Sequence, residues 1–300
     1  MTDLQKGFLA VLAGGAAIGS AAIFMRLAPV TPTSAAFWRM TLASPALLLW
    51  AWWTLSRTPN ETRPPRPPHG RTMRDLALVG FWFAADMALW HWAVAGTTVA
   101  NATLLANMSA VLTALAGLVF FGDRFQGRFY IGLLLALAGA ATLIGQSAEV
   151  SPDNLGGDLL GLATAFAYAG YLISGGRVRQ RHPTAVVMAG SGVVTALFLL
   201  PLALSETGAF VPATAAGWLP LIGLGLVTHV LGQSLIMFGL AHLPAAMGSL
   251  SLLIQPVVAA LLAWLIFGEA LGWAHLVGAV LIFSGIQLAR RSLKKPGRAG

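Results

Sequence analysis

The sequence predicts an all-α membrane protein of ten transmembrane helices, built as two inverted five-helix repeats around a central cavity. Three observations predict this fold. Hydrophobic residues make up 57% of the 300 residues and charged residues only 9%, whereas a soluble domain usually carries about 25% charged residues. Apolar runs of the roughly 20 residues that cross a bilayer follow one another along the chain. Part of the first half also recurs in the second half with the same spacing of glycines.

The apolar runs define ten predicted spans separated by mostly short loops. They cover residues 7–27, 33–56, 73–95, 99–121, 127–146, 156–176, 184–204, 216–239, 244–267 and 272–290. We interpret the first as a retained membrane helix and not as a signal peptide, because no small-residue cleavage site follows it. The one long loop, RTPNETRPPRPPHGRTMRD, is rich in proline and arginine and is expected to be extended or disordered.

Basic residues mark one side of the membrane. Every Lys and Arg except Arg26 and Arg39 falls on the same predicted side. The opposite side carries Glu149, Asp153, Asp158, Glu206 and Glu269. Because basic loops stay in the cytoplasm, we expect a multi-pass protein of the cell inner membrane with both termini cytoplasmic. The net charge of +8 then reflects topology, and no nucleic-acid partner is expected.

The stretch FFGDRFQGRFYIGLLLALAG (120–139) matches IFGEALGWAHLVGAVLIFSG (266–285) at a shift of 146 residues. The shift superimposes three glycines and one acid: Gly122, Asp123, Gly132 and Gly139 fall on Gly268, Glu269, Gly278 and Gly285. Each stretch predicts a Gly-acid turn, followed by a span whose glycines allow close packing. A coincidence between two glycine-rich helix pairs is the alternative interpretation.

The repeat predicts two halves, residues 1–150 and 151–300, with five spans each. Because five is an odd number, the second half must lie inverted in the membrane. Inverted repeats are typical of transporters, whose substrate site lies near the membrane midplane between the halves.

Three segments resemble the EamA family of the drug/metabolite transporter superfamily: TPTSAAFWRMTLASPALLL, LANMSAVLTALAGLVFFGDRFQGRFYIGLLLALAG and LLIQPVVAALLAWLIFGEALGWAHLVGAVLIFSG. The resemblance covers nearly the whole chain in two copies. The Trp-rich third span and the basic loop before it are most similar to the YddG-type amino-acid exporters. The resemblance implies ten helices around a central cavity and the export of small metabolites. Ala110 stands where the second half has Pro256, so the fourth span is expected to lack the bend of the ninth.

The third span contains an acid in the apolar stretch FWFAADMALWHWAVAG. Trp82, Asp86 and Trp90 are four residues apart and so share one helix face, whereas His91 lies well round the helix from Asp86. A charge inside the membrane is costly unless it faces a wet cavity or a partner. We therefore expect Asp86 to bind a substrate amine or a proton. The alternatives are a structural salt bridge or a neutral, hydrogen-bonded acid for Asp86, and an interhelical hydrogen bond for His91.

Other candidate substrate-binding residues lie on four further spans. Arg39 either neutralises Asp86 or holds a substrate carboxylate; the alternative is a snorkelling arginine at the membrane interface. The remaining candidates share helix faces in pairs, for which plain helix packing is the alternative: Thr103 with Asn107, Tyr168 with Tyr171, and Ser251 with Gln255. Pro256 follows Gln255 and is expected to bend its helix, because proline removes a backbone hydrogen bond.

No catalytic centre, metal site or cofactor is expected. The chain has no cysteine, and its six histidines are scattered. An intramembrane enzyme would need an acid and a base at the same depth on facing surfaces; Asp86, His91 and His229 are the only candidates for this, and His229 is isolated in the sequence.

The sequence therefore predicts a secondary transporter that exports small metabolites, most consistently neutral or aromatic amino acids, by alternating access. A drug or metabolite exporter of broader specificity is the alternative within the same class, and an intramembrane enzyme is the alternative from another class. The expected partners are a small-molecule substrate and the lipid bilayer, and the chain is expected to act as a monomer.

Overall fold

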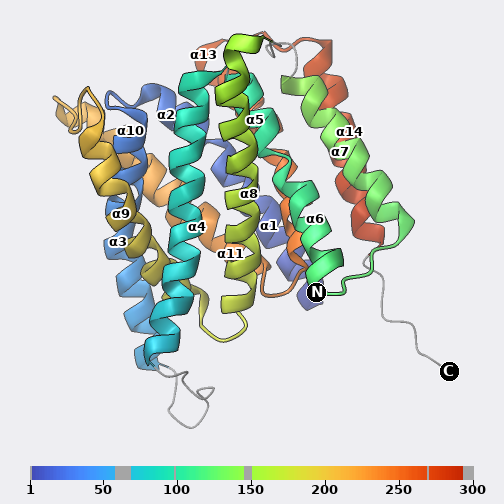
Figure 1. Ribbon diagram of the computed structural model, residues 1–300, viewed down its shortest axis with the longest axis horizontal. Helices are drawn as coiled ribbons and strands as arrows, with labels where there is room; N and C mark the ends of the chain where they lie inside the picture. The colour runs from blue at the N-terminus through green and yellow to red at the C-terminus, as the bar shows by residue number, and fades with distance from the viewer. Residues whose placement is uncertain (1, 58–68, 98, 145–150, 269, 293–300) are drawn as a thin grey trace.

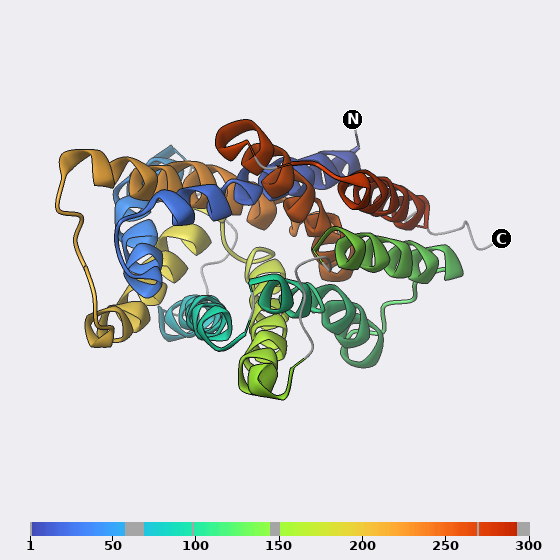
Figure 2. The same ribbon diagram turned by 90° about the horizontal axis from the view of Figure 1, so that it is seen from above.

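The computed structural model describes residues 2–57, 69–97, 99–144, 151–268 and 270–292. Within them the chain is helical and contains no β-strand. The longer helices run side by side from one end of the molecule to the other (Figure 1), and Figure 2 views the bundle from one end. The α-helices are α1 (Asp3–Gly19), α2 (Ala21–Leu27), α3 (Pro32–Arg57), α4 (His69–Gly96), α5 (Val99–Ala106), α6 (Ser109–Phe120), α7 (Gly127–Ile144), α8 (Leu155–Val178), α9 (Thr184–Ser205), α10 (Trp218–Gly223), α11 (Ser234–Gly239), α12 (Ala245–Ser251), α13 (Gln255–Phe267) and α14 (Trp273–Arg291).

Eight helical segments of the described residues are long and apolar enough to cross a membrane, so the chain is a multi-pass membrane protein. They are Asp3–Leu27, Gly70–Ala93, Ala102–Phe120, Pro152–Val178, Thr184–Ser205, Ala215–Gly239, Ala245–Phe267 and Trp273–Arg291. The second and fifth predicted spans are also helical, as α3 and α7, but fall outside these eight. The apolar part of α7, Gly127–Leu143, is shorter. The count of ten spans stays a prediction.

Some expectations concern parts of the chain outside the described residues. These include most of the proline-rich loop, the acids Glu149 and Glu269, and the basic residues that follow Ser292.

The start of α1 and the end of α14 lie at the same end of the bundle. The guanidinium of Arg290 lies 4.7 Å from the centre of the Phe8 ring. A Cβ atom at Gly7 would lie 2.7 Å from Cβ of His242, which places the turn between α11 and α12 at this end too. This arrangement agrees with the expected grouping of both termini on one side.

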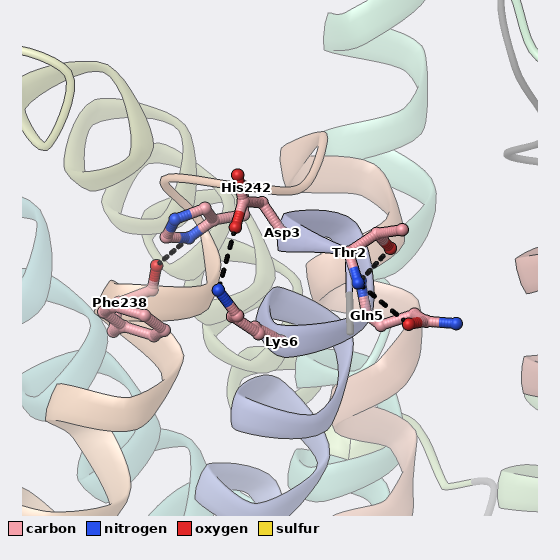
Figure 3. A network of polar contacts seen from close by, with 6 residues as sticks. All are labelled: Thr2, Asp3, Gln5, Lys6, Phe238 and His242. Atoms are coloured by element: carbon pink, nitrogen blue, oxygen red, sulfur yellow. Dashed lines mark hydrogen bonds and ion pairs between the residues drawn. The ribbon is translucent and has the colours of Figure 1, made fainter.

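Short-range contacts fix the first turn of α1, as Figure 3 shows. The Thr2 hydroxyl accepts a hydrogen bond from the Gln5 amide at 3.3 Å, and the Gln5 side chain accepts one from the Thr2 amide at 2.9 Å. This reciprocal capping box provides partners for backbone N–H groups that would otherwise have none. Lys6 pairs with Asp3 at 3.2 Å.

The pair α7 and α14 packs unusually closely, and Figure 1 shows the two helices side by side. A Cβ atom at Gly132 would lie 2.5 Å from the carbonyl oxygen of Gly285, and one at Gly139 would lie 2.6 Å from that of Gly278. Residue numbers rise along α7 while those of its contacts fall along α14, so the helices are antiparallel. Only glycine permits this approach of two backbones.

The two Gly-acid turns have the same backbone conformation. Gly122 after α6 has φ = 67°, and Gly268 after α13 has φ = 69°. Positive φ at the end of a helix favours glycine, which explains why the repeat keeps glycine there. In the first turn, the Asp123 amide donates a hydrogen bond to the Gly117 carbonyl at 2.9 Å, and partial burial raises the pKa of the Asp123 carboxyl.

The fourth span is interrupted, contrary to the expectation drawn from Ala110. Helix α5 ends at Ala106 and α6 begins at Ser109, and between them the Met108 amide bonds to the Leu105 carbonyl at 3.0 Å. The ninth span is interrupted between α12 and α13 by the 3-10 turn Leu252–Ile254. Shifting 107–108 by 146 gives 253–254, so both breaks occupy the same place in the repeat. Proline is therefore not required for the break.

Helix contacts repeat between the halves. Helix α4 packs on α8, and α1 packs on α11 and on the π-helical segment Leu224–Gln233 that precedes it. The first pair joins the third and sixth spans, and the second pair joins the eighth and first spans. In the repeat, the third span corresponds to the eighth and the sixth to the first, so the two contacts are equivalent. Helix α3 packs on α9, which joins the second and seventh spans.

Candidate functional site

Asp86 and Arg39 are ionisable side chains buried inside the bundle. Asp86 on α4 and Arg39 on α3 are each 6% exposed. They interact electrostatically with each other and with Tyr168 and Tyr171 of α8. Within the described residues, however, neither charge has a direct ion pair. The structure thus brings four of the predicted site residues together from three helices.

Four rings form a column beside these charges. His229 stacks on Phe83 with centroids 5.6 Å apart, and Phe83 stacks on Tyr171 at 4.6 Å. Tyr171 in turn stacks near Tyr168 at 6.0 Å. The Arg39 guanidinium lies 5.9 Å from the Phe83 ring centre, within range of a cation–π contact. The column crosses from α4 to α8 and to the π-helical segment, so it joins the two halves of the chain.

Two amide side chains hold the tyrosines. Gln233 Nε2 donates a hydrogen bond to the Tyr171 hydroxyl at 2.9 Å, and the Gln255 side chain lies within range of a polar interaction with the Tyr168 hydroxyl. Gln255 is the first residue of α13, and the buried Pro256 follows it. The break in the ninth span therefore positions one of the predicted site residues.

The π-helical segment carries three buried polar side chains. Thr228, His229 and Gln233 of this segment are at most 1% exposed. A π-helix turns more widely than an α-helix and occurs frequently at functional sites. His229 and Gln233, four residues apart, both contact members of the ring column.

The ring contacts of Trp82, Trp90 and His91 are with residues outside this column, although His91 lies within electrostatic range of Arg39. Trp82 packs on α8, where a Cβ atom at Gly170 would lie 2.6 Å from its ring. Trp90 contacts His91 edge to face at 5.2 Å. His91 Nδ1 lies 2.5 Å from the Met87 carbonyl of its own helix, in place of the expected interhelical bond.

The remaining predicted residues lie near the two helix breaks. Thr103 is half-buried on α5, and its carbonyl accepts a bond from the Asn107 amide at 3.1 Å. Asn107 lies in the break itself, with a buried side-chain nitrogen. The Ser251 hydroxyl donates to the Met247 carbonyl at 2.8 Å, so its hydrogen goes to its own helix.

Several buried polar atoms have no hydrogen-bond partner among the described residues. They are Arg39 Nε, Asp75 Oδ2, His91 Nε2, Asn107 Nδ2, Arg179 Nε, His182 Nε2, Ser234 Oγ, Ser249 Oγ and both ring nitrogens of His229. Buried polar groups in proteins nearly always bond to protein, ordered water or a ligand. Among them, Arg39 and His229 lie beside Phe83 of the column and Asn107 lies in the break of the fourth span, so these three side chains have hydrogen-bonding capacity left for water or a solute.

An apolar groove of about 700 Å³ lies between α13 and α14, and its walls include Leu261, Leu276 and Phe283. These side chains are exposed on the outside of the bundle. None of the predicted site residues lines this groove, and we assign it to the lipid-facing surface.

Sequence reasoning missed Phe83, His229 and Gln233 as members of the cluster. It treated His229 as isolated, which is wrong, because His229 stacks on Phe83 and lies within electrostatic range of Arg39. A signal was available: the shift of 146 residues carries Phe83 onto His229. Residues that are equivalent in an inverted repeat meet where the axis between the halves passes.

Comparison with known proteins agrees with the helical architecture. The model of the EamA-like transporter family matches residues 5–145 and again residues 155–291. A solved crystal structure superimposes with a TM-score of 0.78 at 22% identity, covering 97% of this chain and 99% of the other. At this identity the likeness shows the fold alone.

Several relatives are named as exporters. A probable amino-acid metabolite efflux pump of Salmonella typhimurium is 30% identical over 197 residues, 62% of this chain and 66% of that protein. A probable terminal-alkyne amino-acid exporter of Streptantibioticus cattleyicolor is 27% identical over 273 residues, 87% of this chain and 86% of that protein. The pseudopaline exporter CntI of Pseudomonas aeruginosa is 28% identical over 207 residues, 69% and 71% of the two chains. With the two family matches spanning most of its length, the chain belongs to the EamA-like transporter family.

Proposed function

We propose that this protein exports neutral or aromatic amino acids across the inner membrane by alternating access. The observation that carries the proposal is the pair of buried opposite charges, Asp86 and Arg39, neither of which has a direct ion pair among the described residues. A zwitterion supplies both missing partners: its ammonium group meets Asp86 and its carboxylate meets Arg39. The stacked rings of Phe83 and Tyr171 offer an adjacent apolar surface.

The halves 1–150 and 151–300 are, in this proposal, inverted repeats of five spans. Two contacts support it. The antiparallel pair α7 and α14 touches through glycines that the shift of 146 exchanges, and Phe83 stacks on its own equivalent, His229. A site on the axis between two such halves can open to either side when one bundle rocks against the other.

Counterflow in liposomes tests the transport activity. Liposomes that contain the purified protein are loaded with one unlabelled amino acid, and uptake of the same labelled amino acid is followed. We expect stimulated uptake for neutral or aromatic amino acids. Stimulation by unrelated metabolites as well would favour an exporter of broader specificity. Relatives that are named as exporters of different solutes support this alternative. A lack of stimulation by every amino acid would exclude the proposed substrates.

Topology can be measured separately, because the chain has no cysteine. Single cysteines at positions 63 and 297 are expected to react with a membrane-impermeant reagent only from the cytoplasm. A cysteine at 153, in an exposed turn before α8, should react only from outside. Labelling of positions 63 and 153 from the same side would contradict the inverted arrangement.

Pro256→Ala is expected to leave the protein folded but to slow transport severalfold. The break itself should persist, as it does beside Ala110, but with alanine residue 256 regains an N–H that can bond to the Leu252 carbonyl, so Gln255 shifts relative to Tyr168. The measurement is counterflow together with thermal unfolding. Pro45→Ala is a matched control, because Pro45 lies inside α3 with an exposed side chain. Equal rates for both variants would make the bend purely architectural.

A further inference from the structure

His229 has unused hydrogen-bonding capacity at the centre of the protein. Its side chain is 1% exposed, and neither ring nitrogen has a hydrogen-bond partner among the described residues. One face of the ring stacks on Phe83. Even a neutral imidazole carries one N–H donor and one acceptor, so a buried ring with both unused indicates that a further group binds here.

There is space for such a group next to His229. Gly192 of α9 is buried opposite the ring, and a Cβ atom there would lie 3.7 Å from His229 Nε2, an ordinary van der Waals distance. The next neighbour, Leu47, would be 4.0 Å away. By contrast, a Cβ atom at Gly80 or Gly170 on neighbouring helices would come within 2.6 Å of a side chain. The side of the imidazole that faces α9 therefore has room for about one atom.

Arg39 is a second hydrogen-bond donor near the space beside His229. It lies within electrostatic range of His229, its guanidinium approaches the Phe83 ring, and its Nε is buried without a partner among the described residues. A guanidinium and an imidazole N–H that lie within electrostatic range of each other are suited to a carboxylate, because each can donate to one of its oxygens. Asp86 supplies the opposite charge of the same cluster.

We propose that His229 is a specificity-determining residue that, with Arg39, binds the carboxylate of the transported solute, one oxygen of which enters the space beside Gly192. This assignment rests on the proposed function and adds a residue to its site. The π-helical turn of Leu224–Gln233 brings His229 inward to this position. The site is then expected to bind solutes that carry a carboxylate more tightly than amines that have the same side chain but lack the carboxylate.

Two substitutions test the ring nitrogens of His229 and the space beside them separately. His229→Phe keeps a ring that can stack on Phe83 but removes both nitrogens. Gly192→Ala leaves His229 unchanged and fills the space beside it. Gly176→Ala is the control, because a Cβ atom there would meet only ordinary contacts, at 3.5 and 3.7 Å, with Leu240, away from the ring column.

The probes share one side chain: L-phenylalanine, 3-phenylpropanoate, which lacks the ammonium group, and phenethylamine, which lacks the carboxylate. Each competes against counterflow of labelled L-phenylalanine. We expect His229→Phe and Gly192→Ala to raise the half-inhibitory concentrations of L-phenylalanine and 3-phenylpropanoate by roughly 10- to 100-fold, as expected for a lost hydrogen bond to a charged group. Phenethylamine should compete as in wild type, and Gly176→Ala should change nothing. Unchanged values for the two acids, or an equal rise for phenethylamine, would overturn the assignment while the transport proposal stands.

A binding measurement decides the assignment independently of transport. Thermal unfolding of the purified protein is followed with and without 3-phenylpropanoate. Stabilisation of wild type and of Gly176→Ala, but not of His229→Phe, supports the carboxylate site. This holds even if wild type does not exchange L-phenylalanine, because the absence of exchange would exclude only the proposed substrate. Equal stabilisation of all three, or none, refutes the site.

Discussion

Asp86→Asn is expected to leave the protein folded and to weaken amino-acid transport by roughly 10- to 100-fold, the equivalent of one charge-assisted contact of about 1.5–3 kcal/mol. Asparagine keeps the shape of the side chain and some hydrogen bonding, but it can neither attract an ammonium group nor take up a proton. Asparagine therefore lacks the property that either role needs, whether Asp86 binds the substrate amine or carries a proton.

The effect on stability distinguishes this role from a structural one. Breaking a direct buried ion pair costs about 3–5 kcal/mol, because the remaining charge stays buried and unpaired. Asp86 and Arg39 interact without a direct ion pair, so the loss of stability is expected to be smaller. Thermal unfolding and counterflow at several pH values measure the two effects, and Asp153→Asn, in an exposed turn, is the control. Wild-type transport by a stable Asp86→Asn at every pH would remove Asp86 from the site.

The largest loss of stability is expected from substitutions between α7 and α14. In Gly132→Ala or Gly278→Ala, the added methyl group would meet a backbone carbonyl at 2.5 Å or 2.7 Å, and overpacking of this kind typically costs about 1–3 kcal/mol. The repeat further predicts similar losses for the two variants, because the positions are equivalent. Thermal unfolding in detergent measures both.

A double variant makes this prediction sharper. Gly132 and Gly285 touch, so the double alanine variant should lose less stability than the two single variants together, since one separation of the helices relieves both contacts. Gly127→Ala, on the same helix but with no neighbour within 4 Å of its Cβ position, should unfold like wild type. Equal losses for Gly127→Ala and Gly132→Ala would contradict the close packing.

Local signals made parts of the fold predictable. Gly122 and Gly268 were identified by their spacing, and both adopt the positive φ that a glycine turn requires. The interruption of the fourth span was not predictable from Ala110, because the local hydrogen bonds of residues 105–110, and not a proline, shape it. A helix break that contains no proline is difficult to recognise from the sequence.

The candidate site was predictable only in part. Asp86, Arg39, Tyr168, Tyr171 and Gln255 stood out as polar residues in apolar spans, and the structure gathers them. Trp82 shares a helix face with Asp86, yet its ring contacts Gly170 and Phe166 of α8, whereas Asp86 lies near Tyr168 and Tyr171 of the same helix. Phe83 and His229 gained their role only from contact between the halves, which periodicity within a single helix cannot show.

The central claim is that this protein moves amino acids out of the cell through the buried Asp86–Arg39 site, and efflux from intact cells tests it most directly. Cells that express the protein are loaded with labelled L-phenylalanine, diluted into medium without it, and sampled for retained label. We predict faster loss of label than in cells with the empty vector, and a return to the vector rate with Asp86→Asn at equal amounts of membrane-inserted protein. Wild-type cells that retain L-phenylalanine and other neutral amino acids as long as vector cells do would contradict the claim.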